Sequence, residues 1–175
     1  TQKYILRFNI PMNYIFIMIR DRTLKEFLDF LEAHLEQKIT LIVLGGNALV
    51  LLGFKSYTND VDICLIAQQD DLERLKHQFQ EQTLIMVDIF YQGMLKTVHI
   101  KDYLSRITPV QTEYKKINIF LLDIIDVILT KLDRMKEKDW NDCYEAIRKA
   151  KLQINDLDVR RDYYLQHYIG SNIDK

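Results

Sequence analysis

The sequence of 175 residues contains only five glycines and two prolines, and no stretch rich in either residue divides it. Internal repeats and low-complexity segments are also lacking. Because 48% of the residues are hydrophobic and no flexible linker is present, the chain is predicted to be globular rather than disordered. We expect a core over residues 1–122 and a C-terminal helical region over residues 123–175 packed on it.

Neither an excess of basic residues nor a long apolar run is present. The formal net charge is -1, so no global positive field indicates a nucleic-acid-binding protein, although a local basic patch is compatible with this balance. The apolar run from Tyr14 to Ile19 is far shorter than the ~20 residues that span a bilayer, and it lacks the features of a signal peptide. We therefore expect a cytoplasmic protein without membrane contact, with a buried strand or packed segment at this run.

Cysteine is nearly absent as well. The two cysteines, Cys64 and Cys143, lie far apart in the sequence and have no metal-type spacing. They are expected to be buried, reduced thiols, which is the usual state of cysteine in a cytoplasmic protein.

The segment from Leu41 to Leu65 predicts the order strand, tight turn, short helix, loop, strand. Its first apolar run ends at Gly45-Gly46, which is a strong turn signal. Residues 47–52 then have helical composition and end before Gly53, a typical C-terminal glycine. After a polar loop, the sequence DVDICL over residues 60–65 predicts a second strand.

This second strand carries two carboxylates on one face. Residues two apart in a strand project from the same face, ~6.5 Å apart along the chain, so Asp60 and Asp62 converge while Val61 and Ile63 point into the core. Two ionised carboxylates this close repel unless a divalent cation lies between them, and oxygen ligands favour Mg²⁺ or Mn²⁺ over zinc. The backbone at Gly45 and Gly46, together with the helix they open, suits a phosphate. A metal site beside a phosphate cradle predicts a nucleoside triphosphate (NTP) as substrate.

A third acid interrupts a later apolar segment. Thr83 to Tyr91 is predicted to be a strand, and Asp88 is its one acidic residue. A lone buried carboxylate is costly unless it is hydrogen-bonded or binds a metal. If this strand lies beside the strand of Asp60 and Asp62, Asp88 completes a three-carboxylate site. A structural, hydrogen-bonded aspartate is the alternative.

The sequence resembles the signature of the nucleotidyltransferase superfamily typified by DNA polymerase beta. The resemblance consists of Leu44-Gly45-Gly46, then thirteen further residues, then Asp60-Val61-Asp62-Ile63. Within this superfamily, the chain is most similar to the AbiEii-type toxins of type IV toxin–antitoxin systems and to related uncharacterised domains. The similarity lies in the motif GGNALVLLG followed by S-x-T-N-D-V-D-I. The resemblance implies an α/β (α+β) fold with a small mixed sheet. It also implies transfer of a nucleoside monophosphate from an NTP to an acceptor hydroxyl.

The resemblance further implies roles for residues and partners. Asp60, Asp62 and Asp88 would be catalytic and would bind Mg²⁺ or Mn²⁺, and Asp88 would alternatively act as the general base for the attacking hydroxyl. The acceptor would be the 3′ end of tRNA, a protein side chain, or a small molecule such as an aminoglycoside. A cognate antitoxin would be a further partner.

Basic residues near these motifs are candidates for binding the triphosphate. Lys55 and Ser56 lie in the loop before the second strand, although loop residues of these types are usually just solvated. On the C-terminal helices, the run from Lys131 to Asp142 again resembles the toxin branch. This implies that Lys131 reaches the triphosphate as a catalytic residue, and that Asp139 and Asp142 orient basic residues or hold the acceptor. Surface ion pairs are the alternative.

Amphipathic periodicity predicts the remaining elements. A helix over residues 22–37 would be capped by Thr23, with Glu26 completing a capping box. Asp123 is predicted to cap the helix that follows it, and residues 102–114, with Pro109, to form a polar turn region. The other predicted helices cover residues 69–81, 124–136, 139–151 and 157–168, and the other predicted strands cover residues 95–100 and 116–122.

Two other classes of function fit the same residues. The first is a catalytically silent module of a toxin–antitoxin pair, which binds a nucleotide or a partner without chemistry. The second is an RNA-binding protein without transfer activity, whose binding would depend on salt but not on NTP.

Overall fold

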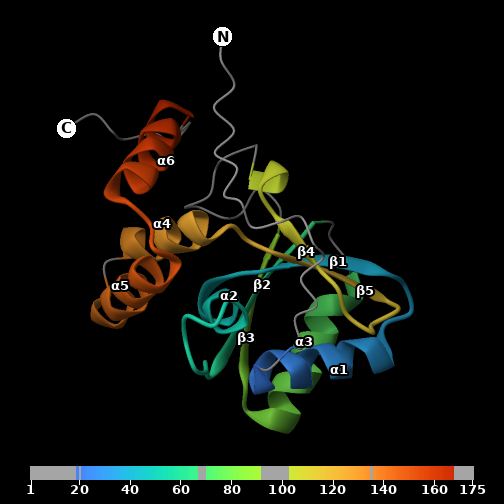
Figure 1. Cartoon of the computed structure of the whole chain (residues 1–175). Coiled ribbons are helices and arrows are strands. Elements are labelled where there is room, and N and C mark those ends of the chain that lie inside the picture. The colour runs from blue at the N-terminus through green and yellow to red at the C-terminus, as the bar shows by residue number, and fades with distance from the viewer. Residues whose placement is uncertain (1–18, 20, 67–69, 92–102, 135, 168–175) are drawn as a thin grey trace, which may run out of the picture.

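The computed structural model describes residues 19, 21–66, 70–91, 103–134 and 136–167. Five strands form one mixed sheet in the order β3-β2-β1-β5-β4, with helices packed around it (Figure 1). The predicted α/β fold, with a small mixed sheet and C-terminal helices, is therefore confirmed. None of the described helices is long and apolar enough to cross a membrane.

The helices and strands alternate through the first half of the chain, and helices alone form its last part. In chain order they are α1 (Arg22–His34), β1 (Ile39–Val43), α2 (Gly45–Leu51), β2 (Asp60–Leu65), α3 (Asp70–Thr83), β3 (Met86–Tyr91), the 3₁₀ helix η1 (Tyr103–Ser105), β4 (Thr108–Val110), β5 (Ile117–Leu121), α4 (Ile124–Arg134), α5 (Glu137–Ala150) and α6 (Ile154–His167).

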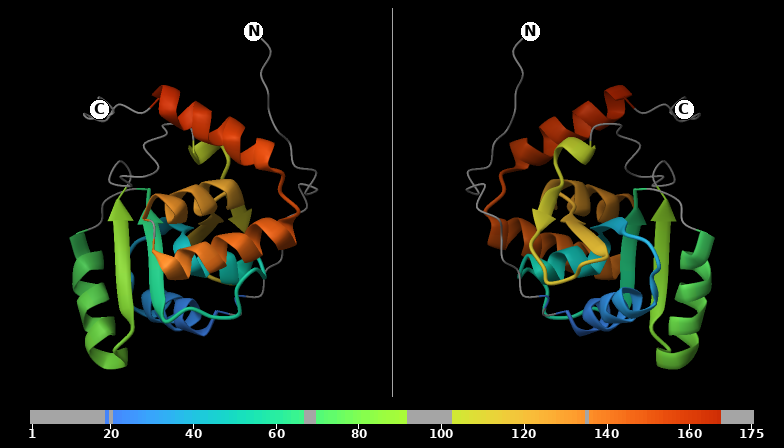
Figure 2. Two further views of the ribbon diagram at one scale, coloured as in Figure 1. Left: turned by 90° about the vertical axis from the view of Figure 1, so that its left-hand side faces the viewer. Right: turned by 90° about the vertical axis from the view of Figure 1, so that its right-hand side faces the viewer.

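The central strand β1 sets the directions of its neighbours. It runs antiparallel to β2 and parallel to β5, while β3 extends the sheet parallel to β2 and β4 runs antiparallel to β5. Figure 2 shows β2 and β3 side by side and pointing the same way. The carboxyl ends of β1 and β5 and the amino ends of β2 and β3 therefore lie at the same end of the sheet.

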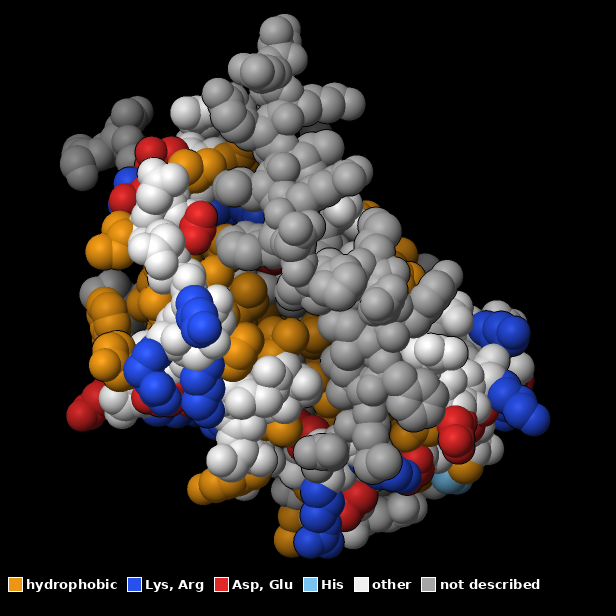
Figure 3. Space-filling model, viewed as in Figure 1, with side chains coloured by type: hydrophobic (Ala, Val, Ile, Leu, Met, Phe, Trp, Pro, Cys, Tyr) orange, Lys and Arg blue, Asp and Glu red, His pale blue; other side chains and the backbone are white. Residues whose placement is uncertain are grey.

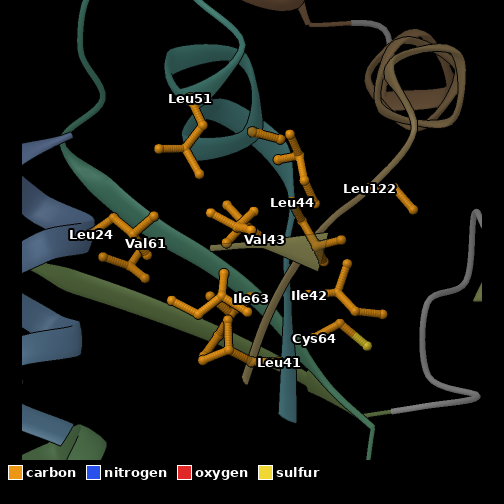
Figure 4. Close-up of a cluster of buried hydrophobic side chains, with 14 of the residues drawn as sticks. Leu24, Leu41, Ile42, Val43, Leu44, Leu51, Val61, Ile63, Cys64 and Leu122 are labelled. Atoms are coloured by element: carbon orange, nitrogen blue, oxygen red, sulfur yellow. The ribbon is translucent and has the colours of Figure 1, made fainter. Parts of the chain in front are cut away.

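Alternation along β2 buries one face of the sheet. Val61 and Ile63 are fully buried, and Leu24 of α1 lies beside Val61 (Figure 4). On the same side of the sheet, Phe27 of α1 and Phe79 of α3 meet edge to face, with ring centroids 5.0 Å apart. Burial of this face leaves the carboxylates of β2 on the opposite one.

The C-terminal helices lie on the other side of the molecule from α1 and α3 (Figure 1), and α4 packs against α2. Asp123 accepts a hydrogen bond of 3.0 Å from the Ile125 N–H, which confirms it as the cap of α4. The fully buried Asp126 accepts from Arg106 Nε at 3.0 Å and from Arg160 Nη1 at 2.6 Å. This ionic cluster ties α6 and the segment after η1 to α4.

Both cysteines are buried, and neither forms a disulfide. Burial raises the pKa of the Cys64 thiol to about 11, against the smaller opposing effect of a hydrogen bond with Tyr103. The prediction of buried, reduced thiols is therefore confirmed.

Charged side chains of both signs are interspersed on the face seen in Figure 3. This agrees with the net charge of -1. Neither the basic nor the acidic side chains alone cover the described residues on that face.

The first helix begins before its predicted cap. Asp21, not Thr23, is the N-cap, and its carboxylate accepts from the Thr23 and Leu24 N–H groups at 3.1 and 3.4 Å. Thr23 Oγ1 donates to Asp21, and Glu26 pairs with Arg22 instead of closing a capping box. An acceptor that is ionised complements the positive end of the helix better than a hydroxyl does, so the carboxylate takes the capping position.

Two later segments also differ from the prediction. α3 continues to Thr83, and Leu84 ends it with a left-handed φ of 61°, so β3 begins at Met86 rather than at Thr83. Pro109 lies in β4, at the edge of the sheet, where a missing N–H is tolerated. The strands predicted over 14–19 and 95–100 lie outside the described residues, apart from Ile19.

Leu84→Gly is expected to raise the free energy of unfolding by about 0.5–1 kcal/mol, because a side chain in the left-handed region is strained and glycine is not. Little packing would be lost, since Leu84 is 87% exposed. Urea denaturation measures the change. Leu165→Gly in α6 is the control and is expected to lose about 1 kcal/mol. Equal losses in the two variants would contradict the expectation.

Candidate active site

Three carboxylates lie on one face of two neighbouring strands. Asp60 and Asp62 alternate with buried Val61, and Asp62 pairs in register with Asp88 of β3. Residues paired in a parallel ladder point to the same face, on strands about 4.8 Å apart. Asp88 is exposed, and the other two acids are half-buried. The strand arrangement that the three-carboxylate hypothesis needs is therefore present, while the roles of the acids stay predictions.

Gly45 lies directly against the carboxylate of Asp62. A Cβ added at Gly45 would stand 2.0 Å from Asp62 Oδ2, which is far inside contact distance. Gly45 also has a φ of +51°, in the region that favours glycine. Both the backbone conformation and the close approach therefore require a glycine here. The predicted tight turn is the first turn of α2 itself.

Gly46 makes room for a second side chain of the site. A Cβ at Gly46 would lie 2.8 Å from Thr58 Oγ1, and this hydroxyl donates a hydrogen bond to Asp60 Oδ1. Thr58 is itself buried, with 8% of its surface exposed. Gly45 thus lets α2 approach the Asp62 carboxylate directly, and Gly46 lets it approach the threonine that is hydrogen-bonded to Asp60.

A buried amide joins the same elements. Asn47 accepts from the Asp62 N–H at 2.7 Å and donates to the Asp60 carbonyl at 3.1 Å and to Asp21 Oδ2 at 2.8 Å. Sequence reasoning missed Asn47, Asp21 and Thr58 as part of the site. The one available signal was a polar amide in an otherwise apolar helix, which must find partners when buried.

The predicted lysines form a separate ionic cluster. Lys131 Nζ lies 2.9 Å from both Asp139 Oδ1 and Asp142 Oδ2, and Lys55 Nζ lies 2.8 Å from the same Asp142 atom. Lys131 and Asp139 are almost fully buried, at 4% and 1% exposure. Asp139 and Asp142 thus hold the two lysines, linking α4, α5 and the loop before β2. Contact of Lys131 with a triphosphate stays a prediction.

Charge pairing outweighs burial in this cluster. Burial alone would raise the pKa of Asp142, but hydrogen bonds from Lys55 and Lys131 overcome it and lower that pKa. Burial likewise opposes the charge of Lys131, but Asp139 and Asp142 together raise its pKa. Both charges are therefore retained in the folded state at neutral pH.

Ser56 is exposed in the loop that leads to β2, next to half-buried Lys55. Ser56 forms no hydrogen bond with any other described residue. Its contact with a triphosphate stays a prediction. The structure therefore brings Gly45 together with Asp62 and Gly46 together with Thr58, and it pairs Lys131 with Asp139 and Asp142.

The donor set fits a magnesium ion held partly by substrate. Within the described ranges, no three histidine, cysteine, aspartate or glutamate side chains gather closely enough to hold a metal by themselves. Mg²⁺ is commonly bound through one or two carboxylates plus substrate phosphates and water. Asp60 and Asp62, half-buried beside the diglycine, fit this mode. A third ligand from Asp88 stays a prediction.

Gly45→Ala is expected to destabilise the fold by at least about 1 kcal/mol more than Gly53→Ala. Both glycines have positive φ, +51° and +77°, so both variants share the backbone strain. Only at Gly45 would the methyl group meet Asp62, because nothing lies within 4 Å of a Cβ at Gly53. Chemical denaturation of both variants checks this, and equal losses would contradict the close contact.

Acid is expected to remove the stabilisation that Asp142 provides. Because its folded pKa lies below the unfolded value of about 3.9, its contribution is present above that pH and is lost as the pH falls through the folded pKa. The raised pKa of Lys131 has the opposite sign: its contribution is present below about pH 10.4 and is lost as the pH rises through the folded value.

Thermal unfolding between about pH 2 and pH 7 tests the acid limb. Wild type should lose more of its Tm on acidification than Asp142→Asn, which lacks the titrating group. Asp71→Asn, at an exposed acid of α3, serves as the control and should follow wild type. If Tm falls with pH equally in wild type and Asp142→Asn, the ionised Asp142 does not stabilise the fold, which would contradict the expectation.

One family model matches residues 22–168, and it is described as a nucleotidyltransferase of unknown function (DUF6036). The match runs from α1 to the end of α6, so it contains the diglycine, both acidic strands and the lysine cluster. No curated protein and no solved structure matches the chain. Membership of the AbiEii-type branch stays a prediction. The matched residues make up most of the chain, and the chain therefore belongs to the DUF6036 family of nucleotidyltransferases.

Proposed function

We propose that the protein transfers a nucleoside monophosphate from an NTP to an acceptor hydroxyl and releases pyrophosphate. The observation that carries this proposal is the contact of the Asp62 carboxylate with Gly45, on the sheet face that also bears Asp60 and Asp88. Acidic oxygens and the backbone of the diglycine would then face one ligand that is both anionic and metal-bound. An NTP with Mg²⁺ or Mn²⁺ is such a ligand.

Each residue of the site has a proposed task. Asp60 and Asp62 would hold Mg²⁺, which supplies neutralisation of the triphosphate charge and polarisation of the α-phosphorus when bound. Gly45 and Gly46 would let backbone N–H groups approach the phosphates. The acceptor oxygen would form a bond to the α-phosphorus as the bond to the bridging oxygen breaks, and Asp88 would take the hydroxyl proton.

The lysines, Lys131 on α4 and Lys55 in the loop before β2, would serve the same ligand. Lys55 is 31% exposed at its side chain, so its ammonium would reach solvent and phosphate while Asp142 holds it. Lys131 is far more buried and would act as a catalytic residue only if the triphosphate draws it from its carboxylates. Ser56, exposed beside Lys55, would donate a hydroxyl to a phosphate oxygen.

The acceptor is proposed by class only. A tRNA 3′ end, a protein side chain and a small molecule each offer the required hydroxyl, and a role as a toxin with a cognate antitoxin rests on resemblance alone. Incubation of the protein with each α-labelled NTP, Mg²⁺, and either total RNA or cell lysate would distinguish these acceptors by where the label appears.

Asp60→Asn and Asp62→Asn are each expected to lower label transfer at least about a hundredfold, because each removes a charge that would hold the metal at the reacting phosphate. The replacements are nearly isosteric, so the folded state should be retained. Asp71→Asn on α3 is the matched control and should transfer at the wild-type rate.

Three results would count against the enzyme. If both Asp60→Asn and Asp62→Asn still transfer label at the wild-type rate, the two carboxylates have no part in the reaction. Metal-dependent NTP binding by wild type, without transfer to any acceptor, would favour the catalytically silent module. Salt-dependent RNA binding without NTP would instead favour a binding protein.

A further inference from the structure

The side chain of Asn47 is fully buried at the start of the short helix α2. Its amide oxygen accepts from the Asp62 N–H, and its amide nitrogen donates to the Asp60 carbonyl and to Asp21 Oδ2. Donor and acceptor are therefore both used, and the partners are Asp21, the N-cap of α1, and two residues of β2. A buried amide that is this fully satisfied holds its partners in a fixed arrangement.

The Asn47 amide continues the hydrogen bonding to β2 beyond the point where the pairing of β1 with β2 ends. β1 pairs with β2 through Val43 and Ile63, and the Leu44 N–H still donates to the Asp62 carbonyl at 3.0 Å. Beyond that point β1 has ended, and the next β2 groups facing it are the Asp62 N–H and the Asp60 carbonyl. Asn47 supplies a partner to each, so it replaces the missing strand at the two acidic residues.

Asp21 fixes which way the amide points. Asp21 Oδ2 accepts from the NH₂ group of Asn47, so the amide nitrogen is held toward Asp21 and toward the Asp60 carbonyl. Asp21 is 2% exposed and is held in turn by the first turn of α1, through Thr23 and Leu24. The start of α1, the start of α2 and the start of β2 thus meet at one side chain.

We infer that Asn47 is a positioning residue for the proposed reaction: its amide fixes the backbone on which the Asp60 and Asp62 carboxylates are carried. The inference rests on the proposed function. Asn47 does not touch the reacting atoms, because its amide is buried and directed at backbone and at Asp21. Its effect on transfer would come through the placement of the two acids, for which a small displacement is costly.

Two single variants and their combination separate positioning from simple structural support. Asn47→Asp keeps the acceptor for the Asp62 N–H, but it sets a second carboxylate against Asp21 and turns an acceptor toward the Asp60 carbonyl. Adding Asp21→Asn restores a donor–acceptor pair between the two side chains with the polarity reversed. The Asp60 carbonyl still lacks its donor in the combined variant.

The expected results follow from that difference. Asn47→Asp alone should lower the Tm, and the combined variant should recover most of it. Label transfer and Mn²⁺ affinity in the presence of ATP should stay about tenfold to a hundredfold below wild type in the combined variant. At saturating metal, the loss of transfer should appear in kcat, with KM for the NTP little changed. Asn118→Asp, at an exposed asparagine of β5, is the control and should match wild type in every measurement.

The possible outcomes distinguish a failure of the inference about Asn47 from a failure of the proposed function. If the combined variant regains transfer together with its Tm, Asn47 is only a structural residue and the inference is overturned. If wild type transfers label and folded Asn47→Asp transfers equally well, the inference fails while the proposed function stands. If wild type neither binds Mn²⁺ with ATP nor transfers label, the proposed function fails, and the inference fails with it.

Discussion

The approach of the Asp62 carboxylate to the backbone of Gly45 is the constraint on which the rest of the site depends. It requires β1 to end before Gly45, α2 to begin without a side chain, and β2 to return antiparallel beside β1. Any Cβ at this point would displace the acid or the helix. The sheet order then brings β3, with its own acid, against the outer edge of β2.

Around that contact the chain uses two kinds of polar support. Beneath the acids, the neutral groups of Asn47 and Thr58 hold β2 through hydrogen bonds, at little electrostatic cost. In the second kind, Lys131 lies buried between carboxylates, where pairing must offset a large loss of hydration. Such a cluster is weak evidence for stability, but it fixes α5 against α4 and the loop that leads into β2.

Sequence reasoning succeeded where the information was local. The diglycine and the alternation at Asp60 and Asp62 specify a strand, a turn and a strand within one short segment, and the structure contains them. It failed at Asp21 and at Leu84, because neighbouring residues offered equally good caps and strand formers. It could not foresee Asn47, since its partners lie 26 and 15 residues away and only the tertiary fold brings them together.

The burial of both thiols lowers their reactivity. A thiol whose pKa is raised to about 11 by burial, as in Cys64, is almost wholly protonated near neutral pH and is a poor nucleophile. Cys143 is likewise enclosed, between α5 and α4. Since the sequence has no other cysteine, oxidants and alkylating reagents find no reactive sulfhydryl on the folded protein.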